Sequence, residues 1–392
     1  MKEDGSRWGN GFKLTTAHEM LYFDHNATAP ICAEARNAWL DATQRFIGNP
    51  SSPHRLGARA DAALEDAREK LAGSLGCKAA EIVWTSGATE ANNMVAAHFA
   101  NTGSGGEAWV SLIEHPCVIA AARRYFGGRT TLIPVTGEGV VDLNWLEGSL
   151  KRTRPRFVAI MAANNETGVL QPWAEASQLC RKRGVPFVCD AAQWIGKMPA
   201  RELGHCDYVS GCAHKFGGPQ GVGFLKCRPR TTPLLHGGPQ EDGRRAGTEN
   251  VAGVLAMVAA LEERNARIAS GEIDSHMATR QLFESHLTSA LSDYAIVAAR
   301  SDRLWNTVSV VMPKIDCRQR WVVKLDKLGF AVSTGSACSS GKEAPSHVLS
   351  AMGVPAELAG RVLRFSSGWE TRPSSWDELL GGLRRACTEA QR

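Results

Sequence analysis

A cysteine stands among small and hydroxylic residues in the stretch Ser333 to Gly341, written STGSACSSG. Free cysteine side chains are usually buried, yet glycine, serine and alanine give this segment the composition of a loop with little to bury. A thiol in such a place is either incidental or reactive, because the thiolate is a strong nucleophile. Cys338 is therefore the first candidate for chemistry in this chain.

A carboxylate and a lysine each follow a short apolar run that is typical of a strand. Asp190 comes directly after Val185–Cys189, where a carboxylate is costly to bury without a cationic or hydrogen-bonding partner. Lys215 lies between Tyr208–Ser210 and a glycine-rich turn, which is either solvated surface or a rigid position for a lysine that binds an aldehyde covalently. A buried aspartate beside a ring nitrogen would keep that nitrogen protonated.

Three further strand ends carry polar residues that allow two interpretations each. Thr85–Asn92 is a glycine turn with hydroxyl groups that opens a helix, so it forms either an anion site suited to phosphate or a plain N-cap. His115, after Glu114, is either a hydrogen-bonded structural residue or a ring that acts on a ligand. The amides of Ala163–Gly168 either fix a polar ligand or make an Asx turn.

A phosphate cradle, an aspartate for a ring nitrogen, a flat residue near a ring and a lysine for an aldehyde are the parts that hold pyridoxal 5'-phosphate. No single part is specific to that cofactor. The ordered set along the chain predicts it.

The elements that must position these groups alternate between short apolar runs and helical patterns. We expect seven strands, at Ile82–Trp84, Trp109–Ile113, Thr131–Val135, Phe157–Met161, Val185–Cys189, Tyr208–Ser210 and Val222–Leu225. A helical stretch from Ala58 to Leu75 precedes them, with Gly76 as its C-cap. The alternation predicts an α/β fold with a mostly parallel sheet covered on both faces, whose ligands bind beyond the carboxyl ends of the strands.

The pattern changes after a helix over Val251–Leu261, and this change predicts two domains. We assign residues 31–265 to a large domain that binds the cofactor. Residues 1–30 and 266–392 would form a smaller domain, which carries the cysteine loop at about 333–345. A chain of 392 residues exceeds the size at which one core usually keeps growing, which agrees with this division.

Composition excludes several classes of protein. Neither an apolar leader nor a run long enough to span a membrane occurs, so we expect a cytoplasmic protein. The eleven cysteines contain no CxxC pair, so we expect small core residues in a reducing compartment and no metal site. The net charge of +5 is mild, and we interpret the basic run Lys151–Arg156 as a solvated turn rather than a nucleic-acid contact.

The chain resembles the cysteine desulfurases, including the nitrogen-fixation and housekeeping iron-sulfur desulfurases, within the class V aminotransferase branch of fold-type I pyridoxal-phosphate enzymes. The resemblance runs from Tyr22–Pro30 to Arg364–Gly368. Between them it includes Gly48–His54, Thr85–Glu90, Glu114–His115, Asn164–Gly168, Asp190–Gln193, His214–Lys215, Arg244–Asn250 and Ser336–Cys338. It implies a seven-stranded large domain, a smaller C-terminal α/β domain, and conversion of L-cysteine to L-alanine.

The resemblance also implies a role for each matched residue. Lys215 would bind the cofactor covalently and remove the Cα proton, and His115 would stack on the ring and move protons. Cys338 would accept the sulfur as a persulfide. The other expected contacts are Asp190 to the ring nitrogen, Gln193 to the phenolic oxygen, Ala88, Thr89 and His214 to the phosphate, Asn165 and Arg364 to the substrate carboxylate, and Thr248 to the phosphate in the neighbouring subunit of a homodimer.

The sequence departs from the family pattern at the phosphate site and at its end. Cys212 and Ala213 stand where serine and glycine are usual, and a thiol donates more weakly than a hydroxyl. The chain stops soon after Leu379–Arg385, so we expect no long tail for an iron-sulfur scaffold.

Several functions remain open from the sequence. The sulfur acceptor is not identified, and iron-sulfur clusters or a thio-cofactor are candidates. The group that deprotonates Cys338 is either His115 or the bound substrate. Selenocysteine lyase activity, a transaminase, and a sulfur-delivery protein with little turnover alone are the alternatives.

Overall fold

The computed structural model describes residues 20–103, 105–314, 321–334 and 346–390. A central sheet of seven strands confirms all seven predicted runs, in the order β2-β8-β7-β6-β5-β3-β4. Four of the neighbouring pairs are parallel, and β8 runs antiparallel to both of its neighbours. The strands are β2 Ile82–Thr85, β3 Ala108–Ser111, β4 Thr130–Ile133, β5 Phe157–Ala159, β6 Phe187–Asp190, β7 Tyr208–Cys212 and β8 Gly223–Lys226.

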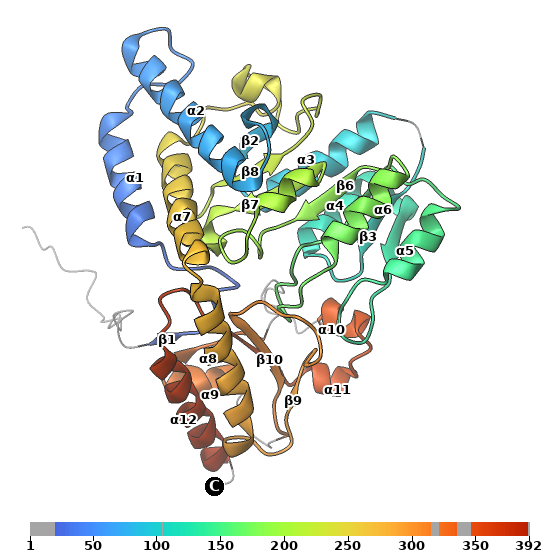
Figure 1. Ribbon diagram of the computed structural model, residues 1–392, viewed down its shortest axis with the longest axis vertical. Helices are drawn as coiled ribbons and strands as arrows, with labels where there is room; N and C mark the ends of the chain where they lie inside the picture. The colour runs from blue at the N-terminus through green and yellow to red at the C-terminus, as the bar shows by residue number, and fades with distance from the viewer. Residues whose placement is uncertain (1–19, 104, 315–320, 335–345, 391–392) are drawn as a thin grey trace, which may run out of the picture.

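Helices cover both faces of this sheet. Successive side chains of a strand point to opposite faces, and here both faces carry apolar side chains that pack against helices. Val83 and Tyr208 pack against α3 and α4 on one face, whereas Trp84 and Val209 pack on the other against α2, α5, α6 and α7. Figure 1 shows the large sheet between these layers, with α1, α2 and α7 along one edge. The helices are α1 Ala33–Arg45, α2 Arg55–Leu75, α3 Ala88–Asn101, α4 Pro116–Phe126, α5 Leu143–Leu150, α6 Trp173–Lys182 and α7 Val251–Ala269.

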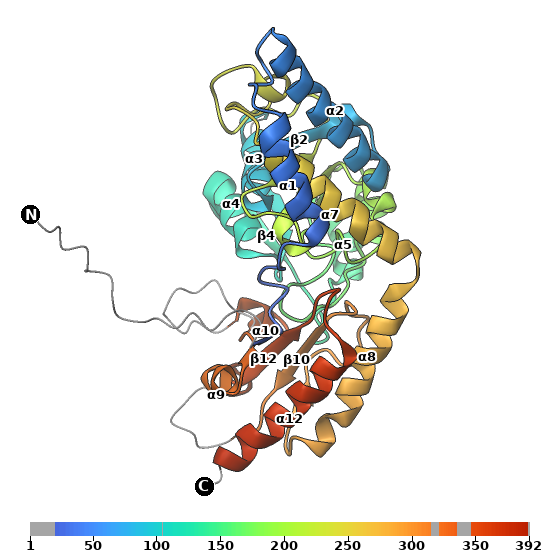
Figure 2. The ribbon, with the colours of Figure 1, turned by 90° about the vertical axis from the view of Figure 1, so that its left-hand side faces the viewer.

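A smaller C-terminal part has its own sheets and its own apolar cluster. Its three strands lie in the order β12-β10-β9, all antiparallel, and a separate two-stranded parallel sheet pairs β1 with β11. Helices α8 and α12 run side by side along this part in Figures 1 and 2. The elements are β1 Leu21–Tyr22, α8 Glu272–His286, β9 Ala295–Ile296, β10 Thr307–Val311, α9 Trp321–Lys327, β11 Phe330–Ala331, α10 His347–Ala351, α11 Ala356–Ala359, β12 Val362–Ser366 and α12 Pro373–Ala390.

The N-terminal segment connects the two parts. Leu21 and Tyr22 pair with Phe330 and Ala331 in the smaller part, and eight residues later the Ala29 N–H group donates to the His214 carbonyl at the end of β7. Residue 265 lies inside α7, so the division of domains near that residue remains a prediction. The separate apolar clusters of the two parts support it.

Three local predictions can be compared with this fold. Gly76 ends α2 in the left-handed conformation, with φ of 71°, as predicted for its C-cap. In the basic run, Arg154 donates to the Gly184 carbonyl and Arg156 to the Phe99 carbonyl, so these two guanidinium groups brace neighbouring turns. Of the helices in the described ranges, none is both long and apolar enough to cross a bilayer.

Candidate active site

A cavity of about 860 Å³ opens where the carboxyl ends of the large-sheet strands meet the smaller part. Its size is typical of a site for a cofactor with its substrate. It gathers the polar strand-end residues identified from the sequence. Those that line it are Ala88, Thr89, His115, Asn165, Asp190, Gln193, Cys212, His214, Lys215 and Arg364.

One end of the cavity is the N-terminus of α3. Gly87 precedes this helix at φ of 154° and supplies no side-chain cap. The Ala88 N–H group meets the Cys212 thiol, and the N–H groups that follow it are available to an anion. A Cβ atom built at Gly223 on β8 would lie 2.5 Å from the Gly87 Cα atom, so the chain passes here too closely for a side chain. Thr89 lines the same end. The arrangement favours the anion site over the plain N-cap.

Asp190 supplies a carboxylate at the end of β6. Its Oδ2 accepts from Asn92 Nδ2 at 2.9 Å and its Oδ1 from the Ala192 N–H group at 3.0 Å. Behind it lies the fully buried Glu114, whose Oε1 accepts from the Met161 N–H group at 2.7 Å. Burial, and then the charge of Asp190, raise the pKa of Glu114 well above its ordinary value, which favours the protonated form of Glu114.

His115 lies in the cavity as the N-cap of α4. Its Nδ1 accepts from the Cys117 N–H group at 3.2 Å and is 3.0 Å from the Cys117 sulfur. Burial, and then the charges of Lys215 and His347, lower the pKa of this ring although Asp190 opposes them. A neutral ring that accepts at Nδ1 carries its proton on Nε2.

Lys215 ends a short 3-10 helix, Ala213–Lys215, that follows β7. Its Nζ donates to the carbonyl oxygens of Asn26 and Ala27, each at 2.7 Å. The preceding His214 has its Nδ1 3.2 Å from the Thr28 hydroxyl, and burial beside Lys215 lowers its pKa to about 4. The N-terminal segment therefore supplies one wall of the cavity around the lysine.

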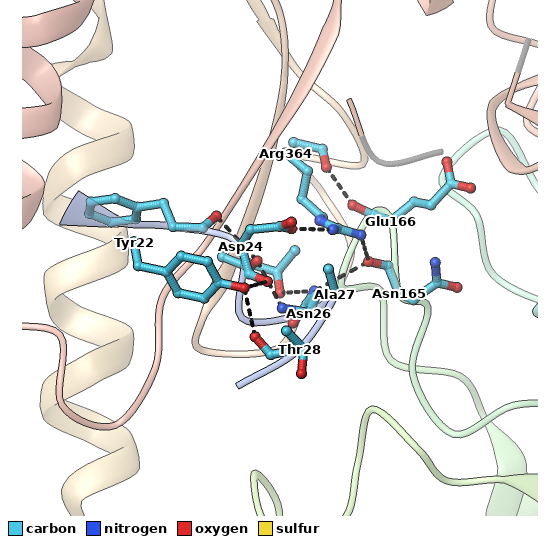
Figure 3. Close-up of polar contacts among 12 residues, drawn as sticks. Tyr22, Asp24, Asn26, Ala27, Thr28, Asn165, Glu166 and Arg364 are labelled. Carbon is cyan, nitrogen blue, oxygen red and sulfur yellow. Dashed lines mark hydrogen bonds and ion pairs between the residues drawn. The ribbon is translucent and has the colours of Figure 1, made fainter. Parts of the chain in front are cut away.

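Arg364 on β12 faces the cavity from the smaller part (Figure 3). Its Nη2 donates to Asp24 Oδ1 at 2.6 Å and its Nη1 to the Asn165 carbonyl at 2.8 Å. The guanidinium is almost fully buried, and its Nε atom has no partner. A buried, oriented guanidinium with N–H groups to spare suits a carboxylate.

The two adjacent asparagines after β5 take different roles. Asn164 is buried and makes the Asx turn, because its Oδ1 accepts from the N–H groups of Glu166 and Thr167, each at 2.9 Å. Asn165 instead lines the cavity. The Asx-turn interpretation is therefore confirmed for Asn164, and the ligand contact of Asn165 stays a prediction.

Cys212, which stands where the family pattern has serine, lines the cavity near Gly87. Its side chain is buried, and burial raises the pKa of the thiol to about 11. The thiol is protonated at neutral pH, so it can donate only a weak hydrogen bond there.

Two predicted site residues are not among those that line the cavity. Thr248 is exposed on the loop between Gln240–Gly243 and α7. Cys338 lies outside the described residues. The residues that flank its segment are described, and both contact the site: Ser333 forms a bridge with Arg364, and Ser346 donates to Glu166.

Sequence reasoning assigned no role to several residues that shape this site. Asn26 and Thr28 lie in the segment Tyr22–Pro30, which the resemblance quoted without roles, and Glu166 and His347 also line the cavity. No local pattern marks these residues, because their side chains form hydrogen bonds with residues 139 or more positions away in the chain.

The residues present fit pyridoxal 5'-phosphate. A primary amine, a carboxylate held by two donors and a helix N-terminus without a side-chain cap line one cavity, and they suit the aldehyde, the ring nitrogen and the phosphate of that molecule. Two buried polar atoms among their neighbours, Asn92 Oδ1 and Ser210 Oγ, have no partner.

Comparison with known proteins agrees with this chemistry. A family model described as class-V aminotransferase matches residues 21–373. A protein of Dictyoglomus turgidum called cysteine desulfurase IscS is 39% identical over 373 residues, which cover 93% of this chain and 94% of that protein.

Solved structures give the same result. One called NifS-like protein superimposes with a TM-score of 0.85 at 32% identity, covering 94% of this chain and all of that chain. Another, described as SspA in complex with cysteine, has a TM-score of 0.74 at 27% identity and covers 88% of this chain and 98% of its own.

Proposed function

The chain belongs to the class-V aminotransferase family and, within it, to the cysteine desulfurases, and from this premise we propose that Lys215, His115, Arg364 and Cys338 carry out the desulfurase reaction in its cavity. The reaction converts L-cysteine to L-alanine and leaves the sulfur as a persulfide. Pyridoxal 5'-phosphate, when bound, supplies a sink for the electron pair that the substrate Cα atom gains when it loses its proton.

Arg364 would bind the substrate carboxylate. Asp24 and the Asn165 carbonyl fix the plane of its guanidinium before substrate arrives, so two N–H groups can meet the two carboxylate oxygens. Asn165 lies beside it at the cavity wall and would add a side-chain contact. Together they place the Cα atom of the substrate over the cavity floor.

Lys215 would remove the Cα proton. Its amine projects from the rigid end of β7 and is held by two backbone carbonyls, which keeps it pointing into the cavity. His115 is neutral with its proton on Nε2, so it can donate that proton to a leaving sulfur or receive one from a thiol.

Cys338 would take the sulfur. Its thiolate attacks the substrate sulfur, a sulfur–sulfur bond forms, the Cβ–sulfur bond breaks, and the electron pair left on Cβ takes up a proton as alanine forms. Cys338 follows Thr334 by four positions in the sequence. Thr334 directly follows Ser333, which pairs with Arg364.

The surroundings of the reaction belong to the same proposal. A second copy of the chain would complete the phosphate site through Thr248, and exposed apolar residues on and around α1, Ile31, Leu40, Ile47 and Leu56, offer a surface for it. The nine cysteines in the described ranges are free thiols, which supports a reducing, cytoplasmic location. The persulfide would pass to an acceptor protein for iron-sulfur cluster or thio-cofactor synthesis.

The observation that carries this proposal is the convergence of Lys215, Asp190, His115 and Arg364 on one cavity. Ser346, after the Cys338 segment, lines this cavity, and Ser333, before it, pairs with the backbone of Arg364. The test incubates the holoenzyme with L-cysteine and a thiol reductant and measures sulfide and alanine. We expect equal amounts from the wild type and neither from Cys338→Ala, which should keep its yellow cofactor absorbance.

A matched control is Cys77→Ala, because that thiol does not line the cavity. It should retain full activity. Unchanged sulfide release by Cys338→Ala would instead mean direct elimination without a protein persulfide. A faster reaction with L-selenocysteine would assign the enzyme to selenocysteine lyases.

A further inference from the structure

A second lysine is buried behind the cavity. Lys197 lies in the turn after β6 and is 3% exposed, and it is not among the residues that line the cavity. Its backbone carbonyl accepts from Trp305 Nε1 at 2.9 Å, and the neighbouring Gly196 carbonyl accepts from Trp369 Nε1 at 2.8 Å. Two indoles of the smaller part therefore hold this turn in place.

The amine of Lys197 contacts the oxygen atoms of two side-chain amides. Nζ donates to Gln193 Oε1 at 2.6 Å and to Asn26 Oδ1 at 2.8 Å. An amide is nearly symmetric in shape, so its orientation is decided by which neighbours donate and which accept. A lysine amine donates at least two hydrogen bonds in either protonation state, so it draws both oxygens toward itself.

The nitrogen atoms of the same two amides, Gln193 Nε2 and Asn26 Nδ2, lie on the cavity side and donate hydrogen bonds there. Gln193 lines the cavity, and its Nε2 donates to the Asn26 carbonyl at 2.9 Å. Asn26 Nδ2 donates to Thr307 Oγ1 at 2.9 Å and to the Asn165 carbonyl at 3.3 Å. Lys197 thus donates to the Gln193 oxygen, and it shares the Asn26 oxygen with Asn306 Nδ2, which donates to it at 3.1 Å.

We propose that Lys197 is a positioning residue, which holds the Gln193 amide so that its N–H group, and not its oxygen, meets the phenolic oxygen of the bound cofactor. This inference rests on the proposed function, because it requires pyridoxal 5'-phosphate in the cavity. Through Asn26 the same amine also steadies the Asn165 segment that Arg364 contacts.

The charged and titratable groups that face Lys197 are Lys215, Arg364, His25 and Cys212. Burial, followed by the charges of Lys215 and Arg364, lowers the pKa of Lys197 well below its ordinary value. Because the uncharged amine still donates two hydrogen bonds, the positioning does not depend on the charge. This separates the proposal from a direct electrostatic effect, and an experiment can distinguish them.

The test is a pH titration of the visible absorbance of the holoenzyme. It follows the proton shared between the Lys215 nitrogen and the phenolic oxygen. A donor to that oxygen stabilises the deprotonated form, so Lys197→Met should raise the apparent pKa by about one unit. In a Gln193→Met background, where no amide remains to be oriented, adding Lys197→Met should give no further shift.

A matched control is Lys226→Met, which removes another buried lysine, one that donates to the Cys206 and Gly204 carbonyls outside the cavity. Its titration should match that of the wild type. Lys197→Ala, which leaves room for water, is made beside Lys197→Met, and either variant that folds carries the test.

Three results would overturn the proposal. The first is an unshifted titration in the folded Lys197 variants, and the second is an equal shift of the apparent pKa with and without Gln193, which would indicate an effect of charge alone. The third is failure of both Lys197 variants to fold while Lys226→Met folds. A wild type that gains no visible absorbance with pyridoxal 5'-phosphate would overturn the proposed function itself, and the inference with it.

Discussion

At the scale of single residues, Arg364 has its partners in place before substrate binds. Asp24 and the Asn165 carbonyl each accept from a different terminal nitrogen, so the guanidinium plane is fixed (Figure 3). Lysine offers a point charge without this planar fork. The site therefore depends on the shape of the cation as well as on its charge.

We expect Arg364→Lys to raise the KM for L-cysteine by about tenfold or more, since a charge-assisted hydrogen bond contributes roughly 1.5–3 kcal/mol. The turnover number should fall less, because the proton-transfer groups are untouched. Steady-state alanine formation gives both constants. An unchanged KM would contradict the assignment of Arg364 to the carboxylate.

His115 is expected to act as a neutral ring. Burial lowers its pKa, and its Nδ1 is occupied by the Cys117 N–H group, so only Nε2 faces the reaction. His115→Gln should keep the cofactor but reduce turnover by about 100-fold or more, the usual contribution of general acid–base catalysis. The rate of alanine formation measures the turnover, and the visible spectrum shows whether the cofactor is bound. A variant with full activity would show that His115 contributes packing and no proton transfer.

Residues with a chemically distinctive type and a strand-end position could be predicted from the sequence, and others could not. Asp190 and Lys215 follow apolar runs, and both line the cavity. Lys197 gives no such signal, because its importance comes from burial beside Gln193 and Asn26, and Asn26 is 171 positions away. Long-range partners of this kind are fixed by the fold and not by local spacing.

At the scale of elements, a buried ion pair ties α2 to the loop that leads to Thr248. Arg68 donates from its two terminal nitrogens to the two carboxylate oxygens of Glu241, at 2.8 and 2.9 Å, and both side chains are nearly inaccessible. Glu241 also accepts from the Trp84 N–H group of β2 at 2.9 Å. One carboxylate therefore joins a helix, a strand and a loop.

Arg68→Met should leave the buried Glu241 carboxylate without its cation, so it should lower the free energy of unfolding by about 3 kcal/mol or more. Glu241→Gln should cost less, because Arg68 keeps its 2.9 Å ion pair with Glu65. The double variant should lose less than the sum of the two, because neither charge is then stranded. Urea unfolding measures all three proteins. Additive losses would show that the pair itself contributes little.

The seven central strands were predictable because strands buried on both faces read as continuous apolar runs. Their ends differ from the predicted ones by at most two residues, as for β3, expected at Trp109–Ile113 and found at Ala108–Ser111. The two-residue strands β1, β9 and β11 were not predicted. Segments this short have no periodicity, and β1 pairs with β11, about 300 residues away in the chain.

At the scale of the whole molecule, a buried histidine links stability to pH. His25 is 6% exposed, and burial, followed by the charges of Lys197 and Arg264, lowers its pKa to about 3. The unfolded chain, with an ordinary histidine pKa near 6.5, binds the proton more readily below that pH. The contribution of the neutral, buried His25 to the free energy of unfolding is therefore full above about pH 6.5. It decreases as the pH falls from 6.5 toward 3.

Between pH 7 and pH 5 this loss should amount to about 2 kcal/mol for His25 alone. His25→Gln should therefore lose about 2 kcal/mol less than the wild type over that interval, although it starts from a lower stability. Urea unfolding at the two pH values tests this, with the exposed His286→Gln as the control. Identical pH slopes for the wild type and His25→Gln would refute it.

A dimer in which each copy completes the other's phosphate site predicts complementation between variants. Thr248→Val should weaken cofactor binding and Lys215→Ala should abolish turnover, each as a homodimer. Refolding the two together forms mixed dimers in which an intact Lys215 meets an intact Thr248 from the other copy, so activity should return. A mixture no more active than its parts would place Thr248 outside the site.

The fold class was predictable at this scale because the alternation of strands and helices persists over most of the chain. The interface between the large part and the smaller part was not predictable from the sequence. It depends on contacts such as the bridge between Val169 and Arg303, which joins a loop of the large part to one of the smaller part. Such contacts become visible only when both parts are folded.

The pairing of β1 with β11 also determines the order in which the site can form during synthesis. The chain emerges with Asp24 and Asn26 first, yet their partners Arg364 and Asn306 are made near the end. The seven-stranded part can fold before the residues that pair with Asp24 and Asn26 have been synthesised. The side of the cavity that Arg364 occupies is therefore assembled last, and we expect a nascent chain to stay inactive until Arg364 has been translated.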